Sequence, residues 1–306
     1  MNRRDFLAAG LANGVAVAAG LSIPAADDNR STRKPGRFQL SYAPHFGMFK
    51  NLAGSDPVDQ VKLMADQGFT ALEDRDMKRQ PIGTQERIRR EMDRHGMTMG
   101  VFVATADFGN PNFTSGRSDL QLQVLKDLKD SLEVAKRMNA RWMTVVPGKV
   151  DRRLPTACQT SNAIDLLKRC AEICEPFGLV MVLEPLNHWS NRPGLFLHTI
   201  PQASRICRAV DSPSCKILFD IYQQQTTEGH LIPLINKAWN EIAYFQIGDN
   251  PGRKEPGTGE INFCDIFGRI QQKAYGGILG MDHGNSMPGE EGEQAVIDAY
   301  VTHDRF

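Results

Sequence analysis

The sequence has no excess of charge of either sign, because 36 lysines and arginines balance 36 aspartates and glutamates. Its hydrophobic fraction of 41% is enough for a sizeable core and too low for a membrane protein. A chain that binds nucleic acid over a broad surface normally carries a basic patch or a positive net charge. The balance argues against nucleic acid as a partner, and any activity must come from a local site.

Cysteines are few and unsuitably spaced for a metal cluster. None of the six occurs before Cys158, and no two of them are separated by two residues. The first absence excludes a lipid-modified cysteine near the N-terminus, and the second argues against a zinc cluster of cysteines. Cys170 and Cys174 lie on an expected helix beside leucines, a pattern typical of cysteines that pack as small hydrophobic side chains, with a disulfide as the alternative.

The first 36 residues differ in composition from the rest. A basic start with Arg3 and Arg4 precedes a run of apolar and small residues from Leu7 to Ile23. This run of ~17 residues is short for a membrane-spanning helix, which needs about 20. We therefore expect a twin-arginine signal peptide and linker over residues 1–36, and export to the periplasm by the twin-arginine machinery. An uncleaved membrane anchor is the alternative.

From Phe38 onward, short apolar runs rich in β-branched residues alternate with amphipathic stretches of helical period. The expected strands are Phe38–Ala43, Thr70–Glu73, Met97–Val103, Trp142–Val146, Leu179–Glu184, Lys216–Asp220, Ile242–Gln246 and Gly277–Asp282. Eight strand–helix units without a dividing linker match a (β/α)8 TIM barrel. An open doubly wound sheet is the alternative, but no glycine-rich phosphate loop follows the first strand. We predict a single α/β TIM-barrel domain over residues 37–306.

Oxygen-bearing side chains end the last four expected strands, as Glu184, Asp220, Gln246 and Asp282. Strand ends of this kind meet at the mouth of a barrel, so these side chains should face one space. Three carboxylates would repel one another there unless a cation lay between them. Taken singly, each could instead cap a helix or pair with a lysine. Together they predict a divalent-metal site that suits Mg²⁺ or Mn²⁺, with cobalt or zinc less favoured.

Several segments are distinctive: Val182–Asn187, Pro193–Leu197, Phe219–Tyr222 and above all the long block Phe245–Phe263. Together they resemble the hydroxypyruvate isomerase family, which belongs to the xylose-isomerase-like group of TIM barrels. The resemblance implies an isomerase or epimerase of a small sugar, sugar acid or hydroxycarbonyl compound. Such an enzyme would act by proton transfer through a metal-stabilised enediolate.

The same resemblance implies roles for single residues. The metal would be bound by Glu184, Asp220, Gln246 and Asp282, and Glu184 and Asp282 would also transfer protons to and from the substrate. Contacts with the substrate are expected from Asn187, His188, Gln223, Arg253, Glu255 and His283. For Arg253 the alternative is a loop arginine paired with Glu255 or Glu260.

Two positions depart from the family. Asp282 stands where the family usually has glutamate, and Gln223 where it usually has histidine, although His188 or His283 could supply the lost imidazole. Metal binding is compatible with both changes, whereas isomerase chemistry does not follow from them. The alternatives are a metal-dependent hydrolase or lyase on the same barrel, and a non-catalytic periplasmic sugar-binding protein. Association into a homo-oligomer is left open.

Overall fold

The structure, a computed structural model, describes residues 38–187 and 193–306. The expected signal peptide at 1–36 lies outside the described residues, and so does His188. Among the residues that are described, no helix is long and apolar enough to cross a membrane.

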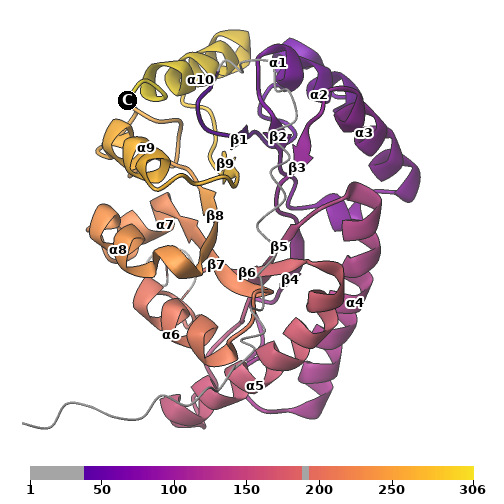
Figure 1. Ribbon diagram of the computed structural model, residues 1–306, viewed down its shortest axis with the longest axis vertical. Helices are drawn as coiled ribbons and strands as arrows, with labels where there is room; N and C mark the ends of the chain where they lie inside the picture. The colour runs from indigo at the N-terminus through magenta and orange to yellow at the C-terminus, as the bar shows by residue number, and fades with distance from the viewer. Residues whose placement is uncertain (1–37, 188–192) are drawn as a thin grey trace, which may run out of the picture. The chain divides into compact units, whose positions relative to one another are not determined.

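Parallel strands form a ring that is surrounded by helices (Figure 1). The strands are β1 (Tyr42–Ala43), β2 (Ala71–Leu72), β3 (Thr98–Met99), β4 (Val103–Ala106), β5 (Trp142–Val146), β6 (Val180–Leu183), β7 (Cys215–Asp220), β8 (Ile242–Gln246) and β9 (Leu279–Gly280). Seven of them form one sheet in the order β1-β9-β8-β7-β6-β5-β4, while β2 pairs with β3. Between β1 and β2, the Glu73 amide donates to the Pro44 carbonyl oxygen at 3.0 Å, which continues the ring. The predicted TIM barrel is confirmed.

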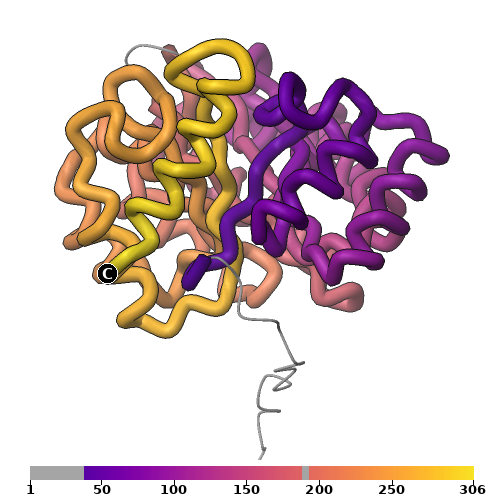
Figure 2. Tube along the Cα trace, turned by 90° about the horizontal axis from the view of Figure 1, so that it is seen from above, coloured from indigo at the N-terminus to yellow at the C-terminus, as the bar shows by residue number. Residues whose placement is uncertain are grey.

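The helices cover the outside of the ring. They are α1 (Lys50–Ala53), α2 (Pro57–Asp66), α3 (Ile82–Arg94), α4 (Ser118–Met138), α5 (Thr156–Cys174), α6 (Ile200–Val210), α7 (Ile221–Thr227), α8 (Leu231–Ala238), α9 (Phe263–Gln272) and α10 (Gly289–His303). Figure 2 shows α10 against the first strand and α1, so the last helix closes the barrel beside the first unit. The third expected strand is divided into β3 and β4, and the short helices α1 and α7 were not expected.

A small hydrophobic cluster fills the inside of the barrel. Its buried members come one from each strand position around the ring: Ala43, Ala71, Val101, Trp142, Val182, Leu218, Tyr244 and Ile278. A larger cluster packs the outer faces of the strands against the helices. Alternate residues of a strand point to the same side, so Glu184, Asp220 and Gln246, each two residues beyond an inner core residue, also point inward. The inner core thereby sets the direction of the side chains at the mouth.

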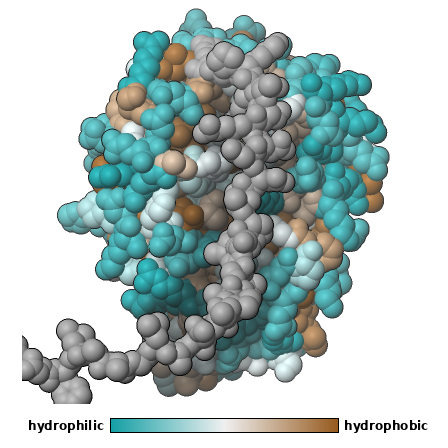
Figure 3. Space-filling view, in the orientation of Figure 1, coloured by the Kyte–Doolittle hydropathy of each residue, from teal (hydrophilic) through white to brown (hydrophobic). Residues whose placement is uncertain are grey.

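The outer surface in the view of Figure 3 is mostly hydrophilic, with isolated apolar residues. The large hydrophobic side chains that are exposed among the described residues are Ile82, Leu122, Phe177, Met287 and Phe306. Apolar side chains scattered singly in this way are common on the surfaces of folded domains.

Candidate functional site

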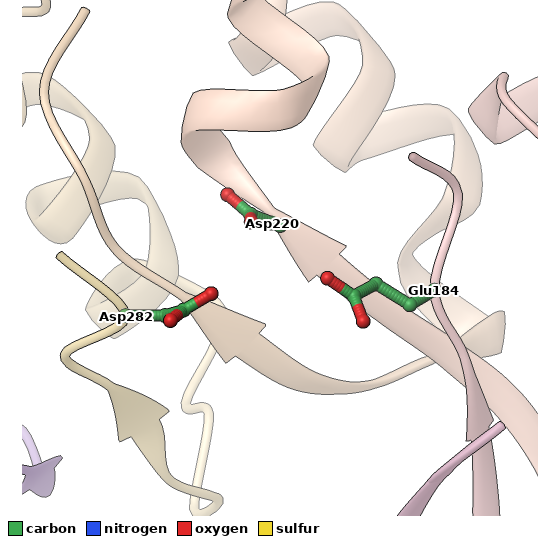
Figure 4. Close-up of side chains that lie close together, drawn as sticks. All are labelled: Glu184, Asp220 and Asp282. Atoms are coloured by element: carbon green, nitrogen blue, oxygen red, sulfur yellow. The ribbon is translucent and has the colours of Figure 1, made fainter. Parts of the chain in front are cut away.

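Three carboxylates meet at the carboxyl ends of the strands. Glu184 follows β6, Asp220 ends β7 and Asp282 follows β9, and one ligand oxygen from each lies within 4.8 Å of the other two. Figure 4 shows the three side chains converging on a common space from separate strands. The structure therefore brings together the three carboxylates that the strand ends predicted.

Gln246, the fourth predicted ligand, lies beside Asp220 because the two residues are paired in the register of β7 and β8. Its Nε2 donates to Oε1 of Glu73 at 3.0 Å. Its Oε1 is buried and has no hydrogen-bond partner among the residues that the structure describes. A buried acceptor without a partner is costly, and a bound cation is one group that would satisfy it.

Two arginines neutralise part of the acidic charge. Nη2 of Arg253 donates to Oδ2 of Asp220 at 3.0 Å and also to Oδ2 of Asp282. Nη2 of Arg75 lies 2.5 Å from the other oxygen of Asp282. No hydrogen bond reaches the Glu184 carboxylate from any described residue. When all three carboxylates are ionised, the two guanidinium groups leave one excess negative charge among these five side chains.

The three carboxylates differ in how readily they ionise. Burial, together with the neighbouring carboxylates of Asp220 and Asp282, raises the pKa of Glu184 to about 8. Burial also raises the pKa of Asp220 to about 6, although Arg253 opposes the shift. For Asp282, burial is outweighed by Arg253 and Arg75, so its pKa is lowered. Without a further cation, the ionised form is most costly at Glu184, the carboxylate that no arginine contacts.

The donor set fits a divalent cation. Carboxylate oxygens and an amide oxygen are hard ligands, and the unpartnered Oε1 of Gln246 lies next to the excess negative charge. The acidic cluster could therefore hold such an ion. The preference for Mg²⁺ or Mn²⁺ over cobalt or zinc stays a prediction.

The two alternative partners suggested for Arg253 lie elsewhere. Both oxygens of Glu255 accept hydrogen bonds from Ser286, one from its amide at 2.9 Å and one from its hydroxyl. Glu260 accepts from Gln225 at 3.1 Å. The interpretation of Arg253 as a loop arginine paired with Glu255 or Glu260 is therefore wrong. Glu255 thus connects its own loop to the loop of Ser286. This contact gives no support to the predicted contact of Glu255 with the substrate.

Gln223 and Asn187 lie beside the cluster. The backbone N–H of Gln223 donates to Oδ1 of Asp220 at 3.1 Å, and the side-chain oxygen of Gln223 accepts from the backbone N–H of Asn187 at 2.9 Å. Gln223, in the position where the family usually has histidine, thus fastens the segment after β6 to the start of α7. Contacts of Gln223, Asn187 and His188 with a substrate stay predictions.

His283 is turned into the wall of the barrel. Its Nδ1 lies 3.0 Å from the carbonyl oxygen of Gly284, and its Nε2 lies 2.9 Å from the hydroxyl of Tyr300 on α10. Burial lowers the pKa of His283 to about 4, so the ring is neutral near pH 7. Both ring nitrogens are engaged, so this geometry gives no support to the suggestion that His283 supplies an imidazole to the substrate, and that role stays a prediction.

Two residues of the site were not among the predicted site residues. Glu73 and Arg75 follow β2 directly, and both reach toward the cluster, Glu73 through Gln246 and Arg75 through Asp282. The signal was present in the sequence, because the run Glu73-Asp74-Arg75 comes after an apolar strand just as Glu184 does. As the end of an expected strand, Glu73 is a plausible residue of the barrel rim, but neither a metal nor a substrate contact was predicted for it.

The comparisons with known proteins agree with this geometry. Residues 61–300 match the family model described as xylose isomerase-like TIM barrel. The hydroxypyruvate isomerase of Escherichia coli K12 is 29% identical over 153 residues, which are 50% of this chain and 59% of that protein. The 2-oxo-tetronate isomerase of Pectobacterium atrosepticum is 26% identical over 241 residues, which are 77% of this chain and 89% of that protein. The match thus spans less than two thirds of the Escherichia coli relative.

Solved structures share the fold. The crystal structure of an AP endonuclease, family 2, from Brucella melitensis aligns with a TM-score of 0.71 over 83% of this chain and 96% of that chain. The sequence identity is 23%, so this likeness shows the barrel and not the reaction.

Proposed function

Because the chain belongs to the xylose isomerase-like TIM-barrel family, we propose that it is a metal-dependent isomerase or epimerase of a small hydroxycarbonyl compound that carries a carboxylate. One observation carries this proposal: three carboxylates converge beside an amide oxygen that has no partner among the described residues. The curated relatives, one a hydroxypyruvate isomerase and one a 2-oxo-tetronate isomerase, support it.

The charge at the mouth supports an anionic substrate. One excess negative charge remains after the two arginines are counted, and a divalent cation would change it to one excess positive charge. A substrate carboxylate would restore neutrality. Arg75 suits this role because its side chain is 67% exposed and its planar guanidinium has further N–H groups to donate.

The roles of the residues follow from their partners. Glu184, Asp220, Asp282 and Gln246 would hold the metal, which when bound would polarise the substrate carbonyl. Glu184 has no arginine partner, so its carboxylate would take the proton from the carbon that bears the hydroxyl group. Delivery of a proton to the neighbouring carbonyl carbon, with transfer of the hydroxyl proton to the former carbonyl oxygen, completes the isomerisation. A second proton-transfer role for Asp282 stays a prediction, because Arg75 and Arg253 already occupy its oxygens.

Isotope exchange tests this function. Mature protein with Mn²⁺ would be incubated with hydroxypyruvate, or with a four-carbon 2-oxo acid, in D₂O and followed by NMR. We expect the isomeric aldehyde to appear with solvent deuterium on carbon. Glu184→Gln keeps the shape and one ligand oxygen but removes the base, so the rate should fall about 10²–10⁴-fold. Glu172→Gln, an exposed change on α5, is the matched control and should leave the rate unaltered.

Two results would contradict the proposal. Substrate binding without any deuterium exchange would favour the non-catalytic sugar-binding protein. Cleavage of the substrate without exchange would favour the hydrolase or lyase.

We further propose that the protein is exported to the periplasm by the twin-arginine route, on the basis of Arg3 and Arg4 before the short apolar run. Arg3→Lys together with Arg4→Lys should leave the protein in the cytoplasm, as measured by cell fractionation. If the double variant still reaches the periplasm, this route is the wrong one.

A further inference from the structure

Glu73 is a carboxylate inside the barrel for which the proposed reaction has no use. It is 4% exposed and follows β2. Its Oε2 accepts from the hydroxyl of Tyr244 at 2.9 Å, and its Oε1 accepts from Nε2 of Gln246 at 3.0 Å. Both donors lie on β8, whereas Glu73 follows β2, which is not part of the seven-stranded sheet. One carboxylate therefore holds two inward-pointing side chains of a single strand.

Two glycines make the space that this carboxylate occupies. A Cβ at Gly280 would lie 2.0 Å from Oε2 of Glu73, and a Cβ at Gly100 would lie 2.4 Å from the hydroxyl of Tyr244. Such contacts are far too short for any side chain at these positions. The two glycines therefore leave space on the inner wall of the barrel for the Glu73–Tyr244 pair. A chance contact between these two side chains would not require glycine at both positions.

The contact with Glu73 decides which end of the Gln246 amide is free. In that contact Nε2 of Gln246 donates and Oε1 of Glu73 accepts, so the NH₂ group is held and the carbonyl oxygen is left. That oxygen is the one without a partner among the described residues, on a residue in register with Asp220. The reverse orientation would present N–H donors to the site, and these cannot bind a cation.

We propose that Glu73 is a positioning residue that orients the Gln246 amide so that its oxygen is available to a divalent cation. This inference rests on the proposed metal site. A partner that fixes the orientation of a metal ligand typically contributes 10–100-fold to metal affinity, without touching the ion. Glu73 would do so through Gln246 alone, and this is what an experiment can isolate.

A double-mutant cycle on Mn²⁺ affinity, measured by isothermal titration calorimetry, tests the proposal. Glu73→Met keeps the volume but removes the acceptor, and should weaken Mn²⁺ binding about 10–100-fold. In the Gln246→Ala background the same change should have no further effect, because the ligand it orients is gone. Glu73→Gln should restore binding, since its carbonyl oxygen can still accept from Gln246. Glu172→Gln, an exposed change on α5, is the control and should bind like the wild type.

The other outcomes contradict either the positioning role of Glu73 or the proposed function. Equal losses in both backgrounds, or no loss in either, would overturn the positioning role while leaving the proposed function intact. A wild-type protein that binds no Mn²⁺ would instead overturn the proposed function, and this inference with it. If thermal melting shows that Glu73→Met does not fold, Gly280→Ala replaces it, because the added Cβ displaces the Glu73 carboxylate and removes no polar group.

Discussion

Two buried aspartates near the mouth have opposite surroundings. Asp249, in the loop after β8, accepts four backbone hydrogen bonds at 2.8–3.1 Å, from the amides of Asn250, Gly257, Gly259 and Ile261. Asp220 faces two other carboxylates and receives only Arg253 and the start of α7. A carboxylate that accepts hydrogen bonds from several backbone amides stabilises a loop. A carboxylate that faces other carboxylates is available to bind a ligand.

This difference explains the most distinctive part of the sequence. Most of the block Phe245–Phe263 is the loop that Asp249 folds, and a Cβ at Gly259 would lie 2.0 Å from the carbonyl oxygen of Asn250. The loop returns to the mouth at Arg253, whose φ of 49° lies in the left-handed region. The block therefore folds a loop that positions one arginine over the acidic cluster.

The largest effect on stability is expected for Asp249→Ala, which tests whether this aspartate holds the loop. Four backbone amides, of which that of Ile261 is buried, would lose their acceptor. We expect the free energy of unfolding to fall by about 4 kcal/mol, since each unsatisfied group costs about 1–3 kcal/mol and water would satisfy some of them. Urea denaturation measures this. Asp130→Ala, which removes an exposed ion pair with Lys126 on α4, is the control and should cost less than about 1 kcal/mol. Equal effects would mean that the four hydrogen bonds do not hold the loop.

The sequence predicted the parts of the site that follow from strand periodicity. Asp220 and Gln246 lie two residues beyond inner core residues, so their inward direction follows from alternation along a strand. Alternation stops where a strand stops, which is why the direction of His283 could not be predicted. The partners of Arg253 could not be predicted either, because a left-handed residue in a long loop turns it back toward the barrel.

A second prediction concerns pH and His283, which is buried like Asp249 but neutral. Burial lowers its pKa from 6.5 to about 4, so the unfolded chain binds a proton at a higher pH than the folded protein. Its contribution to stability is therefore full above pH 6.5 and falls as the pH drops toward 4, by about 3 kcal/mol at about 1.4 kcal/mol per pKa unit. The difference in unfolding free energy between wild type and His283→Gln should narrow over this window. A constant difference from pH 7 to pH 4 would contradict the neutral, buried ring.

Asp220→Asn tests the second aspartate, for which we expect a role in metal binding and not in stability. The change removes a charge from the cluster, and we expect Mn²⁺ affinity to fall at least about 100-fold in calorimetry, more than for loss of a residue that only supports a ligand. Asparagine can still cap α7 by accepting from the Gln223 amide, so the unfolding free energy should change by less than about 1 kcal/mol. Loss of stability without loss of Mn²⁺ binding would place Asp220 with Asp249, as a structural carboxylate.

The smallest effect is expected at Arg75, where the cluster meets solvent. Arg75→Gln removes one positive charge from an exposed position, so the KM for a 2-oxo acid should rise about tenfold, below the 1.5–3 kcal/mol typical of a buried charged hydrogen bond. The KM for a neutral hydroxyketone should change little. Arg79→Gln, four residues further along the chain and paired with Asp76, is the control and should alter neither value. If the KM rises equally for charged and neutral substrates, Arg75 acts by holding Asp282 in place, and the carboxylate of the substrate must be bound by another group.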